Sequence, residues 1–170
     1  MPTTILTEAQ AEQLIQDSKW SVKKVKTMRG HDGDAMSCSL YRDGKEVCEV
    51  YDDSWGGEYM YHWKEGKNFE AELREFAKSI RVESEFFPKG MDYDSDMVVN
   101  SLACTILEAK EAKKEENRIK RACKTKTVFT LKSKPNHELS YKRVYTPEMK
   151  TFLIEKYGDD LQEIINEKFA

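Results

Sequence analysis

A segment of about 30 residues, from Asp94 or Ser95 to Cys123, contains no proline or glycine and nothing else that interrupts a helix. At 1.5 Å per residue such a helix is about 45 Å long, whereas a compact chain of 170 residues has a radius of gyration of about 15 Å. An apolar stripe occupies its first half: Val99, Leu102, Ala103, Ile106 and Leu107. The second half, residues 108–121, is polar nearly all round. We therefore expect the first half to pack on a core and the second half to project from the body or flank it.

The net charge of −3 conceals an uneven distribution along the chain. Residues 32–96 contain 17 acidic and 8 basic residues, whereas residues 110–145 contain 12 basic and 4 acidic residues. The densest basic cluster lies on or just after the long helix: Lys110, Lys113, Lys114, Arg118, Lys120, Arg121, Lys124 and Lys126. Such a cluster can contact nucleic-acid phosphates or an acidic protein. The cluster is interrupted by Glu111, Glu115 and Glu116, and it has no interleaved aromatic residues that could stack on nucleic-acid bases. A solvated helix face is therefore the alternative.

The N-terminal region has the pattern of a helix followed by an antiparallel meander. Thr7 and Gln10 have the spacing of a capping box, which predicts a short helix that ends at about Asp17. Four strands are expected after it, at residues 20–28, 35–42, 45–51 and 58–63. Apolar residues recur at helical spacing over residues 68–80, starting at Lys67 or Asn68, and this helix should cover the sheet.

The C-terminal region predicts a hairpin and two helices. Its strands are expected at residues 127–132 and 139–145, around a turn at residues 133–138. Thr146 is the expected N-cap of a helix that ends at Gly158, and a last helix should begin at Asp159 or Asp160. The fold class is therefore α+β: an antiparallel N-terminal sheet covered by a helix, a long central helix, a β-hairpin and two C-terminal helices.

Residues 83–95 read as a connection without regular structure and predict the internal boundary. The expected domains are residues 1–93 and 94–170, with one continuous domain as the alternative. Apolar runs such as residues 97–99 are far below the roughly 18 residues that a membrane span needs. The first eight residues lack the basic and apolar regions of a secretory signal, so we expect a cytoplasmic protein without membrane contact.

The chain has four cysteines: Cys38, Cys48, Cys104 and Cys123. A hairpin turn at residues 43–44 sets Ser39 opposite Cys48, which places Cys38 on the other face of the sheet. The second pair lies in one predicted helix, about 28 Å apart along its axis. All four are therefore expected to be reduced thiols.

Two further sets of residues are candidates for binding. An aromatic set forms either an alternative interface or the sheet core: Trp55, Tyr59, Tyr61 and Trp63. A short loop forms either an anion-binding loop or a structural turn: Asp52, Asp53, Gly56 and Gly57. This loop lacks the lysine and helix start of a P-loop, and its carboxylates would repel phosphate.

Catalytic and metal-binding motifs are not found in the sequence. His31–Asp34 and His62 match no known metal-site spacing, and no cysteine lies in a local catalytic signature with a histidine. No Gly-x-Ser-x-Gly nucleophile elbow is present. We therefore expect no cofactor, no metal and no enzymatic activity.

Two stretches of the chain carry a family resemblance. They are Asp52-Asp53-Ser54-Trp55-Gly56-Gly57, with the preceding residues 40–47, and Thr146-Pro147-Glu148 followed by Lys156-Tyr157-Gly158 and Ile164-Ile165-Asn166-Glu167. Together they resemble small uncharacterised proteins encoded by tailed bacteriophages and prophages. Relatives often have glycine where this chain has Ser54. The resemblance implies a phage product that acts inside an infected bacterium, and it implies no known activity.

These patterns predict a non-enzymatic phage accessory protein that binds and inhibits a host macromolecule. The expected partner is a host protein or a protein–nucleic acid complex in the bacterial cytoplasm. One alternative is a nucleic-acid-binding protein that uses the basic helix, and another is a nucleotide sponge or enzyme that uses the Asp52–Gly57 loop. The oligomeric state does not follow from the sequence.

Overall fold

The structure is a computed structural model that describes residues 5–31, 33–64 and 68–169. It is a mixed α and β chain with mostly antiparallel sheets, which confirms the predicted fold class. The chain divides into two compact units, residues 1–108 and 109–170. Three parts of the sequence predictions lie outside the described residues. They are residues 1–4 in the secretory-signal prediction, Asp32 of the histidine-containing turn and Lys67 at the predicted helix start.

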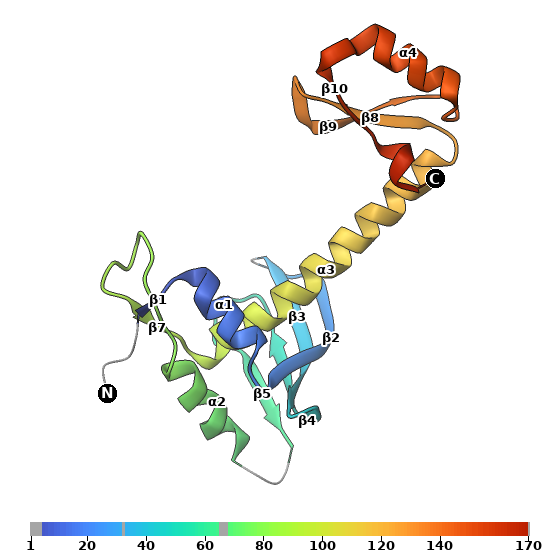
Figure 1. Cartoon of the computed structure of the whole chain (residues 1–170). Helices are drawn as coiled ribbons and strands as arrows, with labels where there is room; N and C mark the ends of the chain where they lie inside the picture. Colours follow the sequence, from blue (N-terminus) through green and yellow to red (C-terminus); the bar gives the residue numbers. More distant parts are fainter. Residues whose placement is uncertain (1–4, 32, 65–67, 170) are drawn as a thin grey trace. The chain divides into compact units, whose positions relative to one another are not determined.

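The main sheet of the N-terminal unit is the predicted four-stranded meander (Figure 1). Its strands are β2 (Trp20–Arg29), β3 (Asp34–Arg42), β4 (Lys45–Asp52) and β5 (Met60–Trp63). Neighbouring strands pair antiparallel in the order of the sequence. On one face Val22, Leu40 and Val50 are buried, so this face forms the sheet side of the core.

The predicted register between β3 and β4 is wrong by one residue. Leu40, rather than Ser39, pairs with Cys48, because a bulge between Leu40 and Tyr41 inserts one extra residue into β4. Cys38 pairs with Val50, so both thiols share the buried face instead of lying on opposite faces. Both cysteines are free, and burial raises the pKa of the Cys38 thiol to about 11 and that of Cys48 to about 12. These thiols are therefore neutral core side chains at physiological pH.

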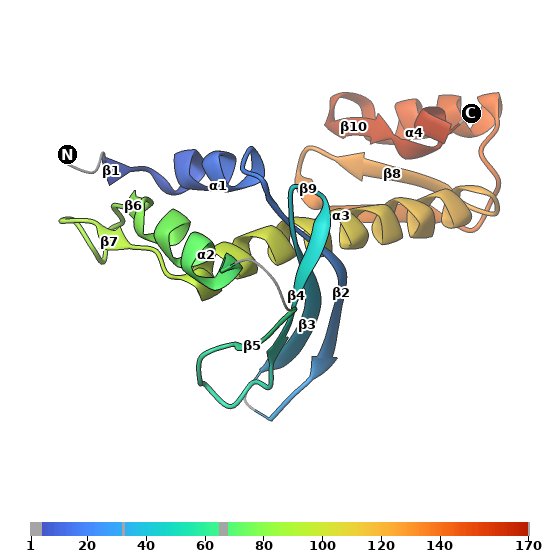
Figure 2. The same ribbon diagram turned by 90° about the horizontal axis from the view of Figure 1, so that it is seen from below.

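Three helices supply the other side of this core: α1 (Glu8–Gln16), α2 (Phe69–Lys78) and the first half of α3 (Ser95–Cys123). Figure 2 shows α1 and α2 on the same side of the main sheet. The capping box of α1 is confirmed, with both the Thr7 and Gln10 hydrogen bonds present. In α2 the fully buried residues are Leu73 and Ala77, whereas Phe76 is only half-buried.

The predicted connection at residues 83–95 is partly structured. β6 (Arg81–Val82) pairs with β7 (Met91–Asp92) and with β1 (Ile5–Leu6), forming a small three-stranded sheet. The boundary also differs from the predicted one after residue 93, because Val98 and Leu102 belong to the N-terminal core. The division falls within α3, after Glu108.

The C-terminal unit packs α4 (Pro147–Tyr157) on a sheet with the strand order β10-β8-β9. These strands are β8 (Thr127–Leu131), β9 (Lys134–Tyr141) and β10 (Leu161–Ile164). Thr146 caps α4 and Gly158 ends it, as predicted. The predicted last helix is wrong: two 3₁₀ turns, Gly158–Asp160 and Ile165–Phe169, flank strand β10.

Strand pairing along β8 explains why residues 161–164 form a strand rather than the predicted helix. β8 is almost fully buried, and it needs a hydrogen-bonding strand on each edge because its backbone groups are removed from water. β9 supplies one edge and β10 the other, where Ile164 pairs with Phe129. The hairpin turn is also tighter than predicted, since β9 already begins at Lys134. Asp160 closes it by accepting hydrogen bonds from the Ser133 N–H and hydroxyl at 2.8 and 2.7 Å.

Among the described residues, no helix is long and apolar enough to cross a membrane.

Candidate functional site

Residues 108–118 of α3 are exposed on every side of the helix. Residues 108–118 contain no buried or half-buried side chain, as expected from their polar composition. Ion pairs one turn apart support this part of the helix, Glu111 with Lys114 at 3.4 Å and Glu115 with Arg118 at 2.6 Å. Three turns of helix are therefore available to a partner without any rearrangement of a core.

The cations of this segment gather on one side of the helix. At 3.6 residues per turn, six positions between residues 108 and 121 lie within about 120° of the circumference. We call this surface the basic face: Lys110, Lys113, Lys114, Asn117, Lys120 and Arg121. It contains no carboxylate: Glu108 and Glu115 lie on the opposite side of the helix, and Glu111 and Glu116 flank the basic face. The acidic residues that interrupt the run in sequence thus lie outside the basic face, and of these Glu111 pairs with Lys114 from its flank at 3.4 Å.

Some cations of the basic face have no carboxylate partner in the described part of the chain. In the described part of the chain, no carboxylate lies within ion-pair distance of Lys113 or Arg121. The Lys120 ammonium lies 5.9 Å from the centre of the Phe169 ring. Lys113 and Arg121 are therefore the cations most available to an acidic partner.

Three of the eight predicted cations lie off this face. Arg118 pairs with Glu115 at 2.6 Å and with Glu138 of β9 at 2.5 Å, so it ties the helix to the C-terminal sheet. Lys124 and Lys126 follow the end of the helix, in the turn before β8. The basic face is thus narrower and more uniform than the sequence cluster.

The chain is also divided by charge. Residues 1–108 contain 13 Lys and Arg against 21 Asp and Glu, a formal charge of −8. Residues 109–170 contain 15 against 10, a formal charge of +5. The basic face therefore belongs to the cationic unit, which favours association with anionic surfaces.

The four residues of the aromatic set separate into two groups. Tyr59, Tyr61 and Trp63 are half-buried and pack against the N-terminal core, so they serve mainly as sheet core. Asp96 of α3 holds two of them, accepting the Tyr59 N–H at 2.9 Å and the Tyr61 hydroxyl at 2.7 Å. Trp55 is separate, 68% exposed, and stacks on His31 with ring centres 4.2 Å apart. The set is therefore not one continuous interface.

Hydrogen bonds within the Asp52–Gly57 loop favour the structural-turn interpretation. The Asp52 and Asp53 carboxylates accept the N–H groups of Ser54 at 2.9 Å and Trp55 at 3.1 Å. Ser54 has a φ of 61° and its hydroxyl accepts the His31 N–H at 2.9 Å, which fastens the loop to the β2–β3 turn. Gly56 has a positive φ, and a Cβ on it or on Gly57 would meet no atom within 4 Å. The loop carboxylates face their own backbone rather than a ligand.

A loop that the sequence did not single out presents exposed phenylalanines. Phe86 in the β6–β7 connection is 85% exposed, and the next residue, Phe87, is half exposed. Arg81 holds this loop by donating to the carbonyls of Lys89 and Gly90 at 3.0 and 3.2 Å, and it pairs with Asp92. Aromatic residues on a fixed loop are typical of contact points in protein interfaces.

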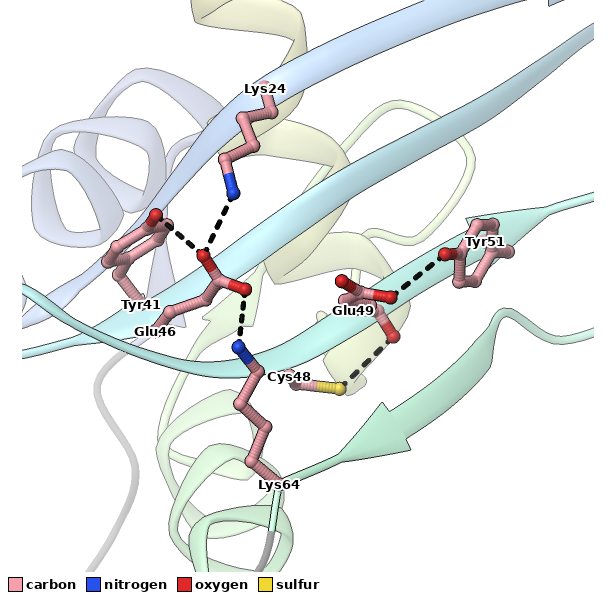
Figure 3. A network of polar contacts seen from close by, with 7 residues as sticks. All are labelled: Lys24, Tyr41, Glu46, Cys48, Glu49, Tyr51 and Lys64. Atoms are coloured by element: carbon pink, nitrogen blue, oxygen red, sulfur yellow. Dashed lines mark hydrogen bonds and ion pairs between the residues drawn. The ribbon is translucent and has the colours of Figure 1, made fainter.

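The sequence patterns also did not predict a polar network on the uncovered face of the main sheet (Figure 3). The Glu46 carboxylate accepts hydrogen bonds from Lys64 at 2.6 Å, Tyr41 at 2.8 Å and Lys24 at 3.1 Å. These donors come from β2, β3 and the residue that follows β5, and β4 carries Glu46. Lys24 reaches it from a bulge at which its own φ is 56°. No sequence motif marks the network, because a bulge in each of two strand pairs aligns its members.

Acid should weaken the sheet through Glu46. Three donors, Lys64 first, lower the pKa of its carboxyl to about 2, against about 4.3 in an unfolded chain. A lowered folded-state pKa means that the stabilisation is complete above about pH 4.3 and is lost as the pH falls toward 2. Glu46→Gln should therefore flatten the fall of melting temperature between these pH values. Glu49→Gln is the matched control on the same strand, and an equal flattening with Glu49→Gln would contradict a specific role for Glu46.

Possible metal-ligating side chains are dispersed among residues 5–31, 33–64 and 68–169. No three His, Cys, Asp or Glu side chains gather there in an arrangement that could hold a metal ion. His62 contacts the edge of the Tyr51 ring, at 5.4 Å between centres.

Comparison with protein-family models, with curated proteins and with solved structures found no match to this chain.

Proposed function

We propose that this chain is a non-enzymatic binding protein that uses the basic face of α3 to occupy an acidic surface of a host protein. The observation that carries the proposal is a helix face of about 120° without a carboxylate, on three turns of helix exposed all round. Its resemblance to phage proteins supports an accessory role in the bacterial cytoplasm, where occupation of the surface would inhibit the host protein.

The acidic residues on the rest of the helix circumference favour a protein over nucleic acid as the partner. A helix that enters the major groove has phosphates on both flanks. Glu111 and Glu116, which flank the basic face, would then approach those phosphates, which opposes binding. An acidic protein surface needs to contact only one side of the helix. Exposed cations without carboxylate partners, such as Lys113, can meet its carboxylates at little desolvation cost.

Charge reversal on the basic face tests this proposal. A triple variant, Lys113→Glu, Lys114→Glu and Arg121→Glu, should lower affinity for the partner by about 100-fold, because opposed like charges across an interface cost several kcal/mol. The chain of 170 residues would be immobilised and exposed to bacterial lysate with and without nuclease. The protein that it retains would be purified and its Kd measured for each variant. Arg118 is left unchanged because its ion pairs support the fold of the C-terminal unit.

The control reverses the same number of charges in the same unit: Lys132→Glu, Lys134→Glu and Lys142→Glu. These exposed lysines lie outside the basic face, so this variant should bind almost as wild type does. Melting temperatures of both variants should stay within a few degrees of wild type, because exposed charges contribute little to stability. Loss of capture after nuclease treatment would indicate nucleic acid instead. Equal affinity of both variants would exclude the basic face.

A further inference from the structure

A cavity of about 590 Å³ opens in the N-terminal unit between β5, α2 and the start of α3. Its volume is within the range of small-ligand sites, about 300–1,000 Å³. We propose that it binds a guanidinium group, presented by an arginine side chain of a partner protein. The proposal is independent of the basic face, because every residue that lines the cavity belongs to residues 1–108.

Aromatic rings form one wall of this cavity. Tyr61 and Trp63 stack with ring centres 5.6 Å apart and an angle of 7° between their planes, and Tyr59 and Tyr93 lie in the same lining. All four rings are half-buried, so part of each remains accessible. A guanidinium is flat and weakly hydrated, and it stacks on aromatic faces more readily than an ammonium does.

Three carboxylates beside this wall have no counter-ion among the residues that the structure describes. Glu58, Asp94 and Asp96 line the cavity, and no cation in the described part of the chain lies within ion-pair distance of them. Asp96 is fixed in place by its hydrogen bonds from Tyr59 and Tyr61. Bringing a cation to these carboxylates therefore requires no movement of Asp96.

Cations already in the cavity are engaged elsewhere. Arg74 of α2 pairs with Glu70 at 2.8 Å, and Lys78 pairs with Glu75 at 3.3 Å. Acidic residues at the start of α3 do not by themselves indicate a ligand. A helix N-terminus favours negative charge, and Asp94 accepts the Met97 N–H at 2.8 Å. What points to a cationic ligand is the combination of these unpaired carboxylates with an accessible aromatic wall in one cavity.

Nuclear magnetic resonance titration of the full chain tests whether the cavity binds a guanidinium group. The observed signal is that of the Trp63 indole N–H. The probes are N-acetyl-arginine amide, its neutral isostere N-acetyl-citrulline amide, N-acetyl-lysine amide and free arginine. The arginine amide should shift the Trp63 signal with an affinity at least about tenfold above that of citrulline, because charge and cation–π attraction are lost together. Equal binding of citrulline or lysine amide overturns the guanidinium assignment. Tighter binding of free arginine than of its amide overturns a protein side chain as the source.

Variants provide the second arm of the test. Glu58→Gln with Asp94→Asn removes two charges while the asparagine can still cap α3, and it should weaken binding of the arginine amide at least about tenfold. Glu83→Gln with Glu85→Gln, exposed and outside the cavity, should bind as wild type does. Glu58→Gln alone provides a milder variant if the double variant melts early. Unchanged affinity in a folded Glu58→Gln, Asp94→Asn variant contradicts the site.

Discussion

Replacing Phe129 with alanine should lower the free energy of unfolding of the C-terminal unit by about 3–5 kcal/mol, as for other fully buried phenylalanines. Phe129 is 1% exposed in the middle of β8, and its ring contacts those of Tyr141 and Tyr157, with centres 5.7 and 5.3 Å apart. Alanine leaves a cavity at the centre of a small core, which has few other residues to close it. The measurement is urea unfolding followed by near-ultraviolet circular dichroism.

The N-terminal unit provides the control for this experiment. Leu73 is fully buried in a separate core, and Leu73→Ala should lower the unfolding free energy of that unit by about 2–5 kcal/mol. Because the two buried clusters share no residue, each substitution should move one unfolding transition and leave the other in place. A single transition that shifts equally with either substitution would show that the units unfold together.

Replacing Asn166 with alanine should destabilise the C-terminal unit by about 3 kcal/mol, because each buried backbone group left without a partner costs about 1–3 kcal/mol. The buried Asn166 side chain accepts the Val128 N–H at 2.7 Å and donates to the carbonyls of Cys123 and Lys126 at 3.1 and 2.9 Å. It therefore joins the last 3₁₀ turn to β8 and to the end of α3. Thermal unfolding of the variant measures this loss.

Asn166→Asp distinguishes these hydrogen bonds from simple loss of packing. An ionised carboxylate can still accept the Val128 N–H, but it opposes the Cys123 and Lys126 carbonyl oxygens and should destabilise the unit. Folding then raises the pKa of this carboxyl, so the variant should regain stability as the pH falls from 7 toward 4. Asn136→Asp, at an exposed position, should show no such recovery. A pH-independent loss in Asn166→Asp would contradict the hydrogen-bonding role.

The hydrogen bonds of Asn166 provide a structural reason for an amide in the Ile164-Ile165-Asn166-Glu167 stretch, one of the two on which the expected phage resemblance depends. Thr146 in the companion stretch caps α4, and Gly158 ends that helix with a positive φ. These residues therefore build the C-terminal unit, so changing them would affect the fold rather than the basic face alone.

Local sequence patterns determined most of the elements of this protein. The capping box at Thr7, the meander of residues 20–63 and the uninterrupted helix up to Cys123 were all predicted within two or three residues. Each depends on contacts between residues close in the chain, such as caps, turns and the helical or alternating spacing of apolar residues. The polar second half of α3 is exposed for the same reason, since it has no apolar stripe to bury.

Only the tertiary structure decided how these elements pair. A bulge beside Tyr41 brings Cys38 and Cys48 onto one face and presents Glu46 to its three donors. Residues 161–164 form a strand rather than a helix because the edge of β8 needs a hydrogen-bonding partner. Arg118 is withdrawn from the basic cluster by Glu138, which is 20 residues away in the sequence. In each case a contact between distant residues outweighs a local preference, and local spacing alone does not specify such contacts.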